Sequence, residues 1–251
     1  MLKGGASGRV IRRVGAPADR KQGRPKVFPK QLLGGTTTIT TTSSYLLSLS
    51  SPLKRCVLDC NQRMTRTVWW AIPTIWVPVA TFFISRSAAM GHSLPDIILM
   101  VASGIFFWTL IEYVLHRFLF HMKTKSYWGN TAHYLLHGCH HKHPMDSLRL
   151  VFPPAGTAVL LFPFWKLIRL FATTSTTPAL VGGGLLGYVM YDCTHYFLHH
   201  GQPSVELQKS LKKNHMNHHF RDLDKGYGVT SSFWDLVFGT LPPPKTAEKS
   251  R

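Results

Sequence analysis

Three short segments of the chain are unusually rich in histidine. They read HGCHH at 137–141, HYFLHH at 195–200 and HMNHH at 215–219. On a helix, residues spaced i, i+3 and i+4 share one face, so each cluster can direct two or three imidazoles toward one point. Imidazole is a common ligand of transition metals. The clusters therefore predict metal binding by His137, His140, His141, His195, His199, His215, His218 and His219.

Two further histidines precede these clusters and are five positions apart, His116 and His121. On a regular helix they would stand about 140° apart around the axis, so they cannot share one face. We therefore expect the helix to distort or end before His121, or the two rings to approach a metal from different angles.

The adjacent residues His140 and His141 point about 100° apart on a helix, so each can serve a different ion. Two ions follow, with ten imidazoles giving about five per ion. This number exceeds the four ligands of a closed zinc site and suits iron. Neutral imidazoles cancel no charge, so we expect carboxylates to hold their second ring nitrogens. The candidates are Glu112, Asp192, Asp146 and Asp222, of which Glu112 and Asp192 are favoured because each follows an apolar run and shortly precedes a histidine. A solvated helix end is the alternative for both.

The remaining histidines and cysteines are given structural roles. His133, His143 and His200 lie beside the clusters but outside their spacing, so they are expected to support the ligands or the fold. Cys139 is soft enough to bind a metal, but we expect it to fill space between helices. The four cysteines show no paired spacing, which indicates neither a disulfide framework nor a thiolate zinc site.

Long apolar runs separate the histidine-rich segments, in a chain that is 45% hydrophobic and 16% charged. A crossing helix needs about 20 residues, so the two shortest runs need help from their flanks. We predict an all-α integral membrane fold with four transmembrane helices. The runs without a charged residue are 67–85, 97–111, 150–165 and 170–191.

Four crossings place the 112–149 loop and the chain from Asp192 onward on one side of the membrane, with every histidine except His92. This side also carries most of the basic loop residues, so the positive-inside rule makes it cytosolic. Lys166 and Arg169 lie on the other side and count against this orientation. The sequence thus predicts a cytosolic helical cap that holds a histidine-rich di-metal site.

The two ends differ in composition from the predicted domain at 64–242. Residues 1–63 are basic and rich in Ser and Thr, and 243–251 form a basic tail. Neither can bury a core, so we interpret both as disordered. For the leader, an organelle-targeting segment and a start codon placed before Met64 are the alternatives. The net charge of +18 does not predict nucleic-acid binding, because the basic residues accompany apolar segments and no recognition motif is present.

The stretch VGGGLLGY contains two glycine patterns. Gly182, Gly184 and Gly187 have the GxGxxG spacing of a dinucleotide-binding turn, but no strand precedes them. Gly183 and Gly187 also form GxxxG, which lets membrane helices approach closely. Helix packing is the favoured interpretation.

Metals at the ends of apolar helices indicate an apolar substrate and oxidation of a carbon–hydrogen bond by dioxygen. Zinc has no redox chemistry, so this reaction calls for iron and for electrons from outside the chain. A histidine-rich metal transporter or storage protein is the alternative of another class. It would require polar residues within the spans, and none of the uncharged runs contains His, Asp or Glu.

The boxes HRFLFH, HGCHH, HYFLHH and HMNHH occur in the order found in the membrane fatty acid hydroxylase superfamily. EYVLHRFLFH, YDCTHYFLHH and DKGYGVTSSFWDLVFGTLP, with further segments across 67–242, resemble the plant-type fatty acid 2-hydroxylases in particular. A sterol oxidase or carotenoid hydroxylase of the same superfamily is the alternative. The resemblance implies that the metal ligands are His116, His121, His137, His140, His141, His195, His199, His215, His218 and His219.

The same resemblance implies a reaction, a location and partners. It implies hydroxylation at carbon 2 of very-long-chain acyl groups, generally those of ceramides, in the endoplasmic reticulum membrane. Two iron ions serve the reaction, although zinc can occupy such sites in structures. Electrons come from cytochrome b5, which we expect to be a separate protein here.

Overall fold

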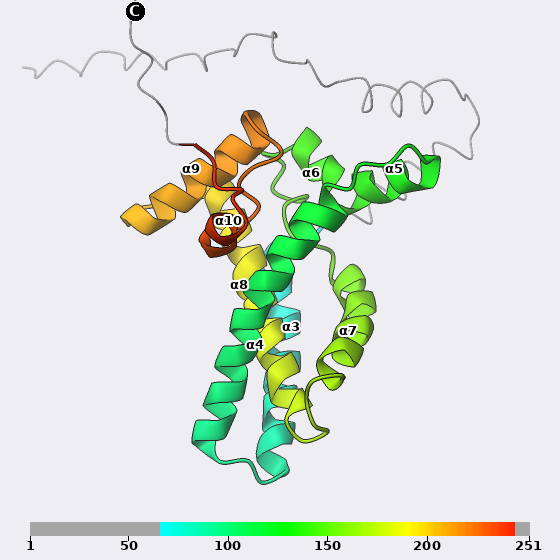
Figure 1. Ribbon diagram of the computed structural model, residues 1–251, viewed down its shortest axis with the longest axis vertical. Coiled ribbons are helices and arrows are strands. Elements are labelled where there is room, and N and C mark those ends of the chain that lie inside the picture. Colours follow the sequence, from blue (N-terminus) through cyan, green and yellow to red (C-terminus); the bar gives the residue numbers. More distant parts are fainter. Residues whose placement is uncertain (1–65, 244–251) are drawn as a thin grey trace, which may run out of the picture. The chain divides into compact units, whose positions relative to one another are not determined.

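The computed structural model describes residues 66–243, and this part of the chain is helical, without strands (Figure 1). The prediction of an all-α fold is confirmed for it. Long helices run side by side, and short ones gather beyond one end of them, where the histidines lie. The long helices are α3 (Ala71–Ala89), α4 (Leu94–Val114), α7 (Pro154–Arg169) and α8 (Thr177–His200). The short ones are α5 (Tyr127–His133), α6 (Cys139–Lys142), α9 (Glu206–Phe220) and α10 (Phe233–Val237), with π-helices η1 (Leu115–Phe120) and η2 (Tyr134–Gly138).

Local sequence explains where α4 begins. The chain reverses between α3 and α4 through Gly91, whose φ of 88° suits glycine. Ser93 then caps α4, and its hydroxyl accepts a hydrogen bond from the amide of Asp96 at 3.4 Å. A proline in the first turn supplies a fixed φ and needs no hydrogen-bond acceptor there. The apolar run therefore forms one uninterrupted helix that leads directly to the first histidine.

Helix α8 is the centre of the bundle and packs against α3, α4 and α7. Ala179, Val181 and Leu185 are buried on it, and Tyr188 lies edge-on to Trp76 of α3, with ring centroids 6.3 Å apart. Helix α8 continues beyond this core as far as His200. A well-packed helix thus extends from the core to the end of the bundle where the short helices gather, and it places histidines there.

The glycines of α8 allow this close packing. A Cβ on Gly183 would overlap the backbone of Val101 on α4, and one on Gly187 would lie 2.6 Å from Cβ of Trp108. Gly182 faces α3 instead, where a Cβ would lie 2.9 Å from the carbonyl oxygen of Ala80. The predicted helix-packing role of this segment is confirmed, and no strand precedes it to form a dinucleotide-binding turn.

Each of the four predicted apolar runs forms a long helix, but the helices differ as possible membrane spans. Within residues 66–243, one continuous helix, Leu94–Phe120, is long and apolar enough to cross a membrane, with 27 residues and a mean hydropathy of 2.0 over an 18-residue window. Helix α7 has 16 residues, about 24 Å at 1.5 Å per residue, against a hydrocarbon thickness of roughly 30 Å. Helix α8 is largely buried by its neighbours.

Candidate metal centre

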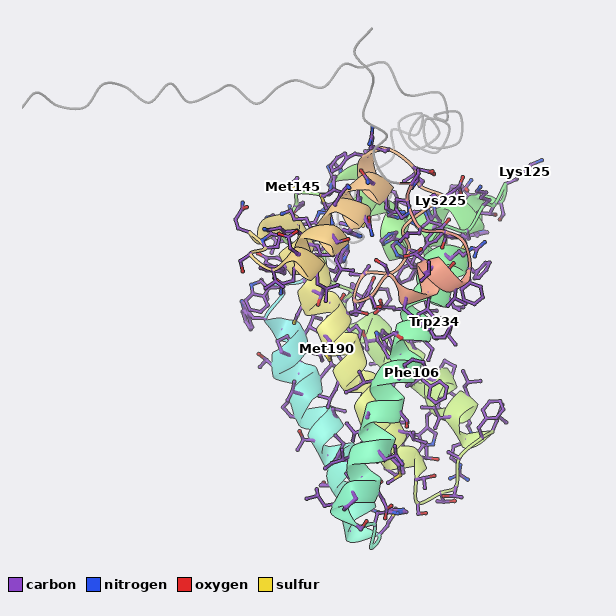
Figure 2. All side chains as sticks on the ribbon, turned by 60° about the vertical axis from the view of Figure 1, so that its left-hand side comes forward. Phe106, Lys125, Met145, Met190, Lys225 and Trp234 are labelled. Carbon is purple, nitrogen blue, oxygen red and sulfur yellow. The ribbon has the colours of Figure 1, made fainter. Side chains whose placement is uncertain are left out.

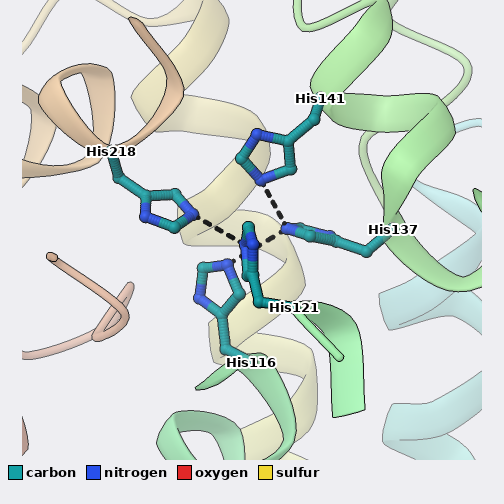
Figure 3. A group of neighbouring side chains, drawn as sticks. All are labelled: His116, His121, His137, His141 and His218. Atoms are coloured by element: carbon teal, nitrogen blue, oxygen red, sulfur yellow. Dashed lines mark hydrogen bonds between the residues drawn. The ribbon is translucent and has the colours of Figure 1, made fainter. Parts of the chain in front are cut away.

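All ten predicted ligand histidines come together in two groups of five. Within each group, the candidate ligand nitrogens lie within 4.8 Å of one another. The groups adjoin, because the rings of His141 and His219 stack with centroids 4.1 Å apart. The first group contains His116, His121, His137, His141 and His218 (Figure 3). The second contains His140, His195, His199, His215 and His219.

A π-helix resolves the unfavourable spacing of His116 and His121. After Val114 the helix widens into η1, and the amide of His121 donates to the carbonyl of His116, five residues earlier, at 3.2 Å. Because an i→i+5 helix has a wider turn than an α-helix, residues five apart lie much closer to one face of it. The two rings lie 5.1 Å apart by centroid and belong to the same group. The expected distortion before His121 is therefore found.

Helices α6 and α9 each contribute histidines to both groups. His140 and His141 are adjacent on α6 and fall into different groups, as their angular separation predicts. Helix α9 is divided in the same way, with His218 in the first group and His215 and His219 in the second. Helix α8 contributes to the second group alone. The division into five and five thus depends on rings from distant segments.

The spacing of the ligand nitrogens fits five ligands around one ion. In the first group, Nε2 of His137 lies 3.1 Å from Nε2 of His116 and 2.9 Å from Nε2 of His141. Two ligands at a right angle, each about 2.1 Å from an ion, lie about 3.0 Å apart, whereas tetrahedral ligands lie about 3.4 Å apart. The second group repeats the shorter spacing, at 3.0 Å for His140–His219, 2.9 Å for His199–His215 and 3.1 Å for His215–His219.

Backbone carbonyls fix the tautomers of two rings in the first group. Nδ1 of His116 lies 2.6 Å from the carbonyl oxygen of Tyr227, and Nδ1 of His218 lies 2.9 Å from that of Lys225. A carbonyl only accepts, so each Nδ1 carries the hydrogen and each Nε2 keeps a lone pair directed into the group. These residues therefore fit a metal ion. These carbonyls could not be predicted from the sequence, because every residue has one.

Burial keeps these imidazoles neutral at pH 7. Desolvation first, and then repulsion by neighbouring imidazoles, lowers the pKa of His137, His141 and His215 well below the usual value. Burial lowers the pKa of His121 to about 3 and that of His218 to about 4. Metals bind the neutral ring, so the nitrogens need not first lose a proton at physiological pH.

The expectation that carboxylates hold ring nitrogens is wrong for Glu112 and Asp192. Oε1 of Glu112 accepts hydrogen bonds from the amide and hydroxyl of Thr230, at 3.0 and 2.7 Å. Asp192 accepts the amide of Phe152, at 3.2 Å. Both carboxylates therefore hold the backbone of segments that are distant in the sequence and lie next to the site. The other two candidates have other hydrogen-bond partners, with Asp146 paired to Arg149 at 3.0 Å and Asp222 accepting the amide of Asp224 at 3.0 Å.

The histidines and the cysteine that were not predicted to bind metal lie outside both groups. His143 and His200 are exposed, His133 is half-buried near His121, and Cys139 is buried without joining either group. His92 lies in the turn between α3 and α4.

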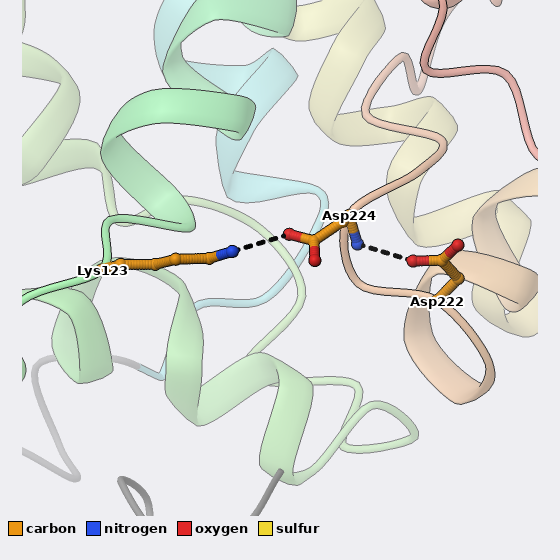
Figure 4. A network of polar contacts seen from close by, with 3 residues as sticks. All are labelled: Lys123, Asp222 and Asp224. Atoms are coloured by element: carbon orange, nitrogen blue, oxygen red, sulfur yellow. Dashed lines mark hydrogen bonds and ion pairs between the residues drawn. The ribbon is translucent and has the colours of Figure 1, made fainter.

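An exposed ion pair crosses the surface above the first group. Lys123, which follows η1, lies 3.1 Å from Asp224, and the amide of Asp224 donates to Asp222 (Figure 4). Both partners of the pair are largely exposed, so water and salt screen it and it stabilises the fold by at most about 1 kcal/mol.

Known proteins share the part of the chain that contains this site. The family model described as fatty acid hydroxylase matches residues 101–240, which contain all ten histidines of the two groups. The chain belongs to the fatty acid hydroxylase family.

Relatives of this hydroxylase occur in plants, fungi and animals. A dihydroceramide fatty acyl 2-hydroxylase of Arabidopsis thaliana is 66% identical over 193 residues, covering 77% of this chain and 81% of that protein. The ceramide very long chain fatty acid hydroxylase of Saccharomyces cerevisiae is 45% identical, covering 72% of this chain and 47% of that protein. A solved structure described as full-length Scs7p, with only the hydroxylase domain visible, has a TM-score of 0.69 at 42% identity, covering 73% of this chain and 70% of that one.

Proposed function

We propose that this hydroxylase is a membrane-bound fatty acid 2-hydroxylase that inserts one oxygen atom from dioxygen at carbon 2 of the very-long-chain acyl group of a ceramide. The observation that carries this proposal is the pair of adjoining five-histidine groups. Relatives named as ceramide or dihydroceramide acyl hydroxylases support the substrate class.

The ten histidines are the proposed ligands of two iron ions, five to each ion. Bound iron supplies the redox chemistry that activates dioxygen, which zinc lacks even where it occupies the same ligands. The protein's part is to hold the rings neutral, oriented and buried. His116, His195, His215 and His218 have almost no exposed surface, so bulk water is excluded from the ligand nitrogens.

A small cavity gives access to both groups. Its volume is about 20 Å³, enough for a water-sized molecule. His137 of the first group and His140 and His195 of the second line it, together with the apolar Phe120 and Phe152. This cavity is the proposed position of dioxygen beside the two groups, with the acyl carbon approaching it from outside.

The long helices are the proposed membrane part, with four crossings. Large apolar side chains are exposed along them, which is the reverse of the pattern on a water-soluble bundle. Trp69 and Trp70 lie exposed at the histidine-bearing end of α3, where aromatic residues favour the membrane interface. The exposed apolar residues include Ile75 and Phe82 on α3, Ile98, Leu99, Phe106 and Phe107 on α4, and Val159 and Phe162 on α7.

In this arrangement the histidines lie on the cytosolic side of the endoplasmic reticulum membrane. Carbon 2 neighbours the acyl carbonyl, so the polar end of the lipid stays at the membrane edge while its tail remains among the helices. Cytochrome b5 is the proposed electron donor. The exposed Lys213 on α9 offers positive charge for docking an acidic partner.

Product analysis tests this proposal. The chain is expressed in a host that lacks its own 2-hydroxylase, under heavy-isotope dioxygen, and its ceramides are analysed by mass spectrometry. We expect 2-hydroxy acyl ceramides that carry one heavy oxygen atom, and none with the His137→Ala variant. Labelled sterol or carotenoid in place of 2-hydroxy lipid would refute the assignment and favour a related hydroxylase.

A further inference from the structure

The two histidine groups are supported in different ways. In the first group, the carbonyls of Lys225 and Tyr227 hold Nδ1 of His218 and His116. In the second group, every Nδ1 is buried without a hydrogen bond of ordinary geometry among the described residues. The carbonyls that lie beside His199 and His195 are those of Pro144 and Leu150, from a different part of the chain. The first group therefore depends on one segment outside its own helices.

A buried carboxylate holds that segment in place. Asp235 is only 1% exposed and lies at the start of α10. Its Oδ1 accepts the amide of Tyr227 at 2.9 Å and the hydroxyl of Thr240 at 2.7 Å, while its Oδ2 accepts the amide of Gly228 at 2.8 Å. Glu112 holds the next amides along, those of Val229 and Thr230. The backbone on both sides of the Tyr227 carbonyl is therefore held in place by hydrogen bonds to these two carboxylates.

The same segment is fastened to α4, the helix that leads to His116. Nε1 of Trp234 donates to the hydroxyl of Thr109 at 2.9 Å, and Trp234 packs against Phe106 with ring centroids 5.9 Å apart (Figure 2). The hydroxyls of Tyr113 and Thr240 lie 2.9 Å apart. Residues 225–240 therefore close over the first group as a unit that is braced against α4.

We propose that residues 225–240 form a carbonyl clasp that sets metal affinity in the first histidine group only, with Asp235 as its positioning residue. This inference rests on the proposed two-ion site. The carbonyls of Tyr227 and Lys225 orient His116 and His218, and partners of this kind typically change metal affinity by about 10- to 100-fold. The second group has no such partner from the clasp, so its ion is insensitive to Asp235.

Asp235→Asn is the informative substitution because an amide cannot replace both carboxylate oxygens. Asparagine keeps one acceptor oxygen, and its NH₂ group then faces a backbone amide of Tyr227 or Gly228, donor against donor. The side chain keeps its size. Asp224→Asn is the matched control, because it makes the same change one residue before the clasp, in an exposed ion pair.

The experiment measures zinc release by the purified full-length chain in detergent. Each protein is loaded with Zn²⁺ and titrated with EDTA, and bound zinc per chain is counted. We expect Asp235→Asn to release one of its two ions at about tenfold lower EDTA than the unmodified chain, with the second ion unchanged. Asp224→Asn should follow the unmodified chain. Parallel weakening of both ions, no change in either, or an equal effect of Asp224→Asn would overturn the proposal.

Two further measurements identify the group and guard against misfolding. In a His140→Ala background, which weakens the second group, Asp235→Asn should weaken the remaining ion, whereas in a His141→Ala background it should not. The reverse result overturns the assignment. If Asp235→Asn fails to fold, Thr240→Val, which removes one hydroxyl donor to Asp235, should give a smaller shift of the same single ion. A chain that binds two zinc ions but forms no 2-hydroxy product refutes the proposed reaction and leaves this inference standing.

Discussion

His140 and His141 are neighbours in the sequence, yet their rings belong to different groups of five. The histidine spacing predicted this division, because adjacent helical residues point about 100° apart. It could not predict which distant ring joins which group, because that depends on how α8 and α9 pack against the earlier helices. The carbonyls that hold His116 and His218 were unpredictable for a related reason: backbone acceptors leave no pattern in the sequence.

Replacing single histidines tests their assignment as metal ligands. His137→Ala and His218→Ala each remove a ring from the first group, so we expect both to abolish 2-hydroxy lipid formation while the protein stays in the membrane. His92→Ala, in the turn between α3 and α4, should retain normal product levels. Normal activity of either ligand variant, measured by lipid mass spectrometry, would contradict the assignment.

Acid should destabilise metal-stripped protein over a defined pH range. In the folded chain the pKa of His121 is lowered to about 3 and that of His218 to about 4, chiefly by burial, against about 6.5 in the unfolded chain. Between these values the unfolded chain binds more protons, so the free energy of unfolding falls as the pH falls from about 6.5 to about 4. The dependence fades within about one pH unit above 6.5, where the imidazoles are neutral in both states.

Thermal unfolding of the metal-stripped chain in detergent, at a series of pH values, measures this effect. The midpoint should decrease as the pH is lowered through that window, and less steeply in His218→Gln, which lacks one of the titrating rings. A midpoint that stays constant from pH 6.5 to 4.5 would show that the rings are not held neutral by burial.

Among the elements, the apolar runs predicted the four long helices, and GxxxG predicted close helix packing, whose partner the structure shows to be α4. The π-helix η1 could only be anticipated as a distortion, because the residues LHRFLF could equally continue an α-helix. Its form depends on tertiary contacts that draw His116 and His121 to one group. The partners of Glu112 and Asp192 also depend on tertiary contacts, because they are backbone amides of segments distant in the sequence.

The glycine contact between α8 and α4 gives a stability prediction. A Cβ at Gly183 would overlap the backbone of Val101, which cannot move aside as a flexible side chain can. We expect Gly183→Ala to lower the free energy of unfolding by about 1–3 kcal/mol, as overpacking does elsewhere. The thermal midpoint in detergent should fall accordingly. Met190→Ala, at an exposed position of the same helix, is the control and should change it little; equal midpoints for the two variants would argue against close packing at Gly183.

At the scale of the whole molecule, the apolar exterior of the long helices and the buried polar centre at their end are compatible with an enzyme at a membrane edge. The basic leader and tail predicted from composition lie outside the described residues. The proposed orientation places the turn between α3 and α4 in the lumen and the histidine end in the cytosol.

Glycosylation mapping tests that orientation. An extended acceptor loop inserted at Gly91 should be glycosylated in the endoplasmic reticulum, whereas the same loop inserted at Met145, an exposed residue at the histidine end, should not. A shift in electrophoretic mobility that glycosidase reverses gives the readout. Modification at Met145 but not at Gly91 would invert the proposed topology.

Two bound ions, each held by its own five histidines, are the basis of the proposed activity. The most direct measurement is metal content per chain after iron loading, by mass spectrometry, in the unmodified protein and in two double variants. We predict two ions in the unmodified chain and one each in His137→Ala with His141→Ala and in His140→Ala with His219→Ala. Two ions retained in either double variant, or a single ion in the unmodified chain, would contradict the account.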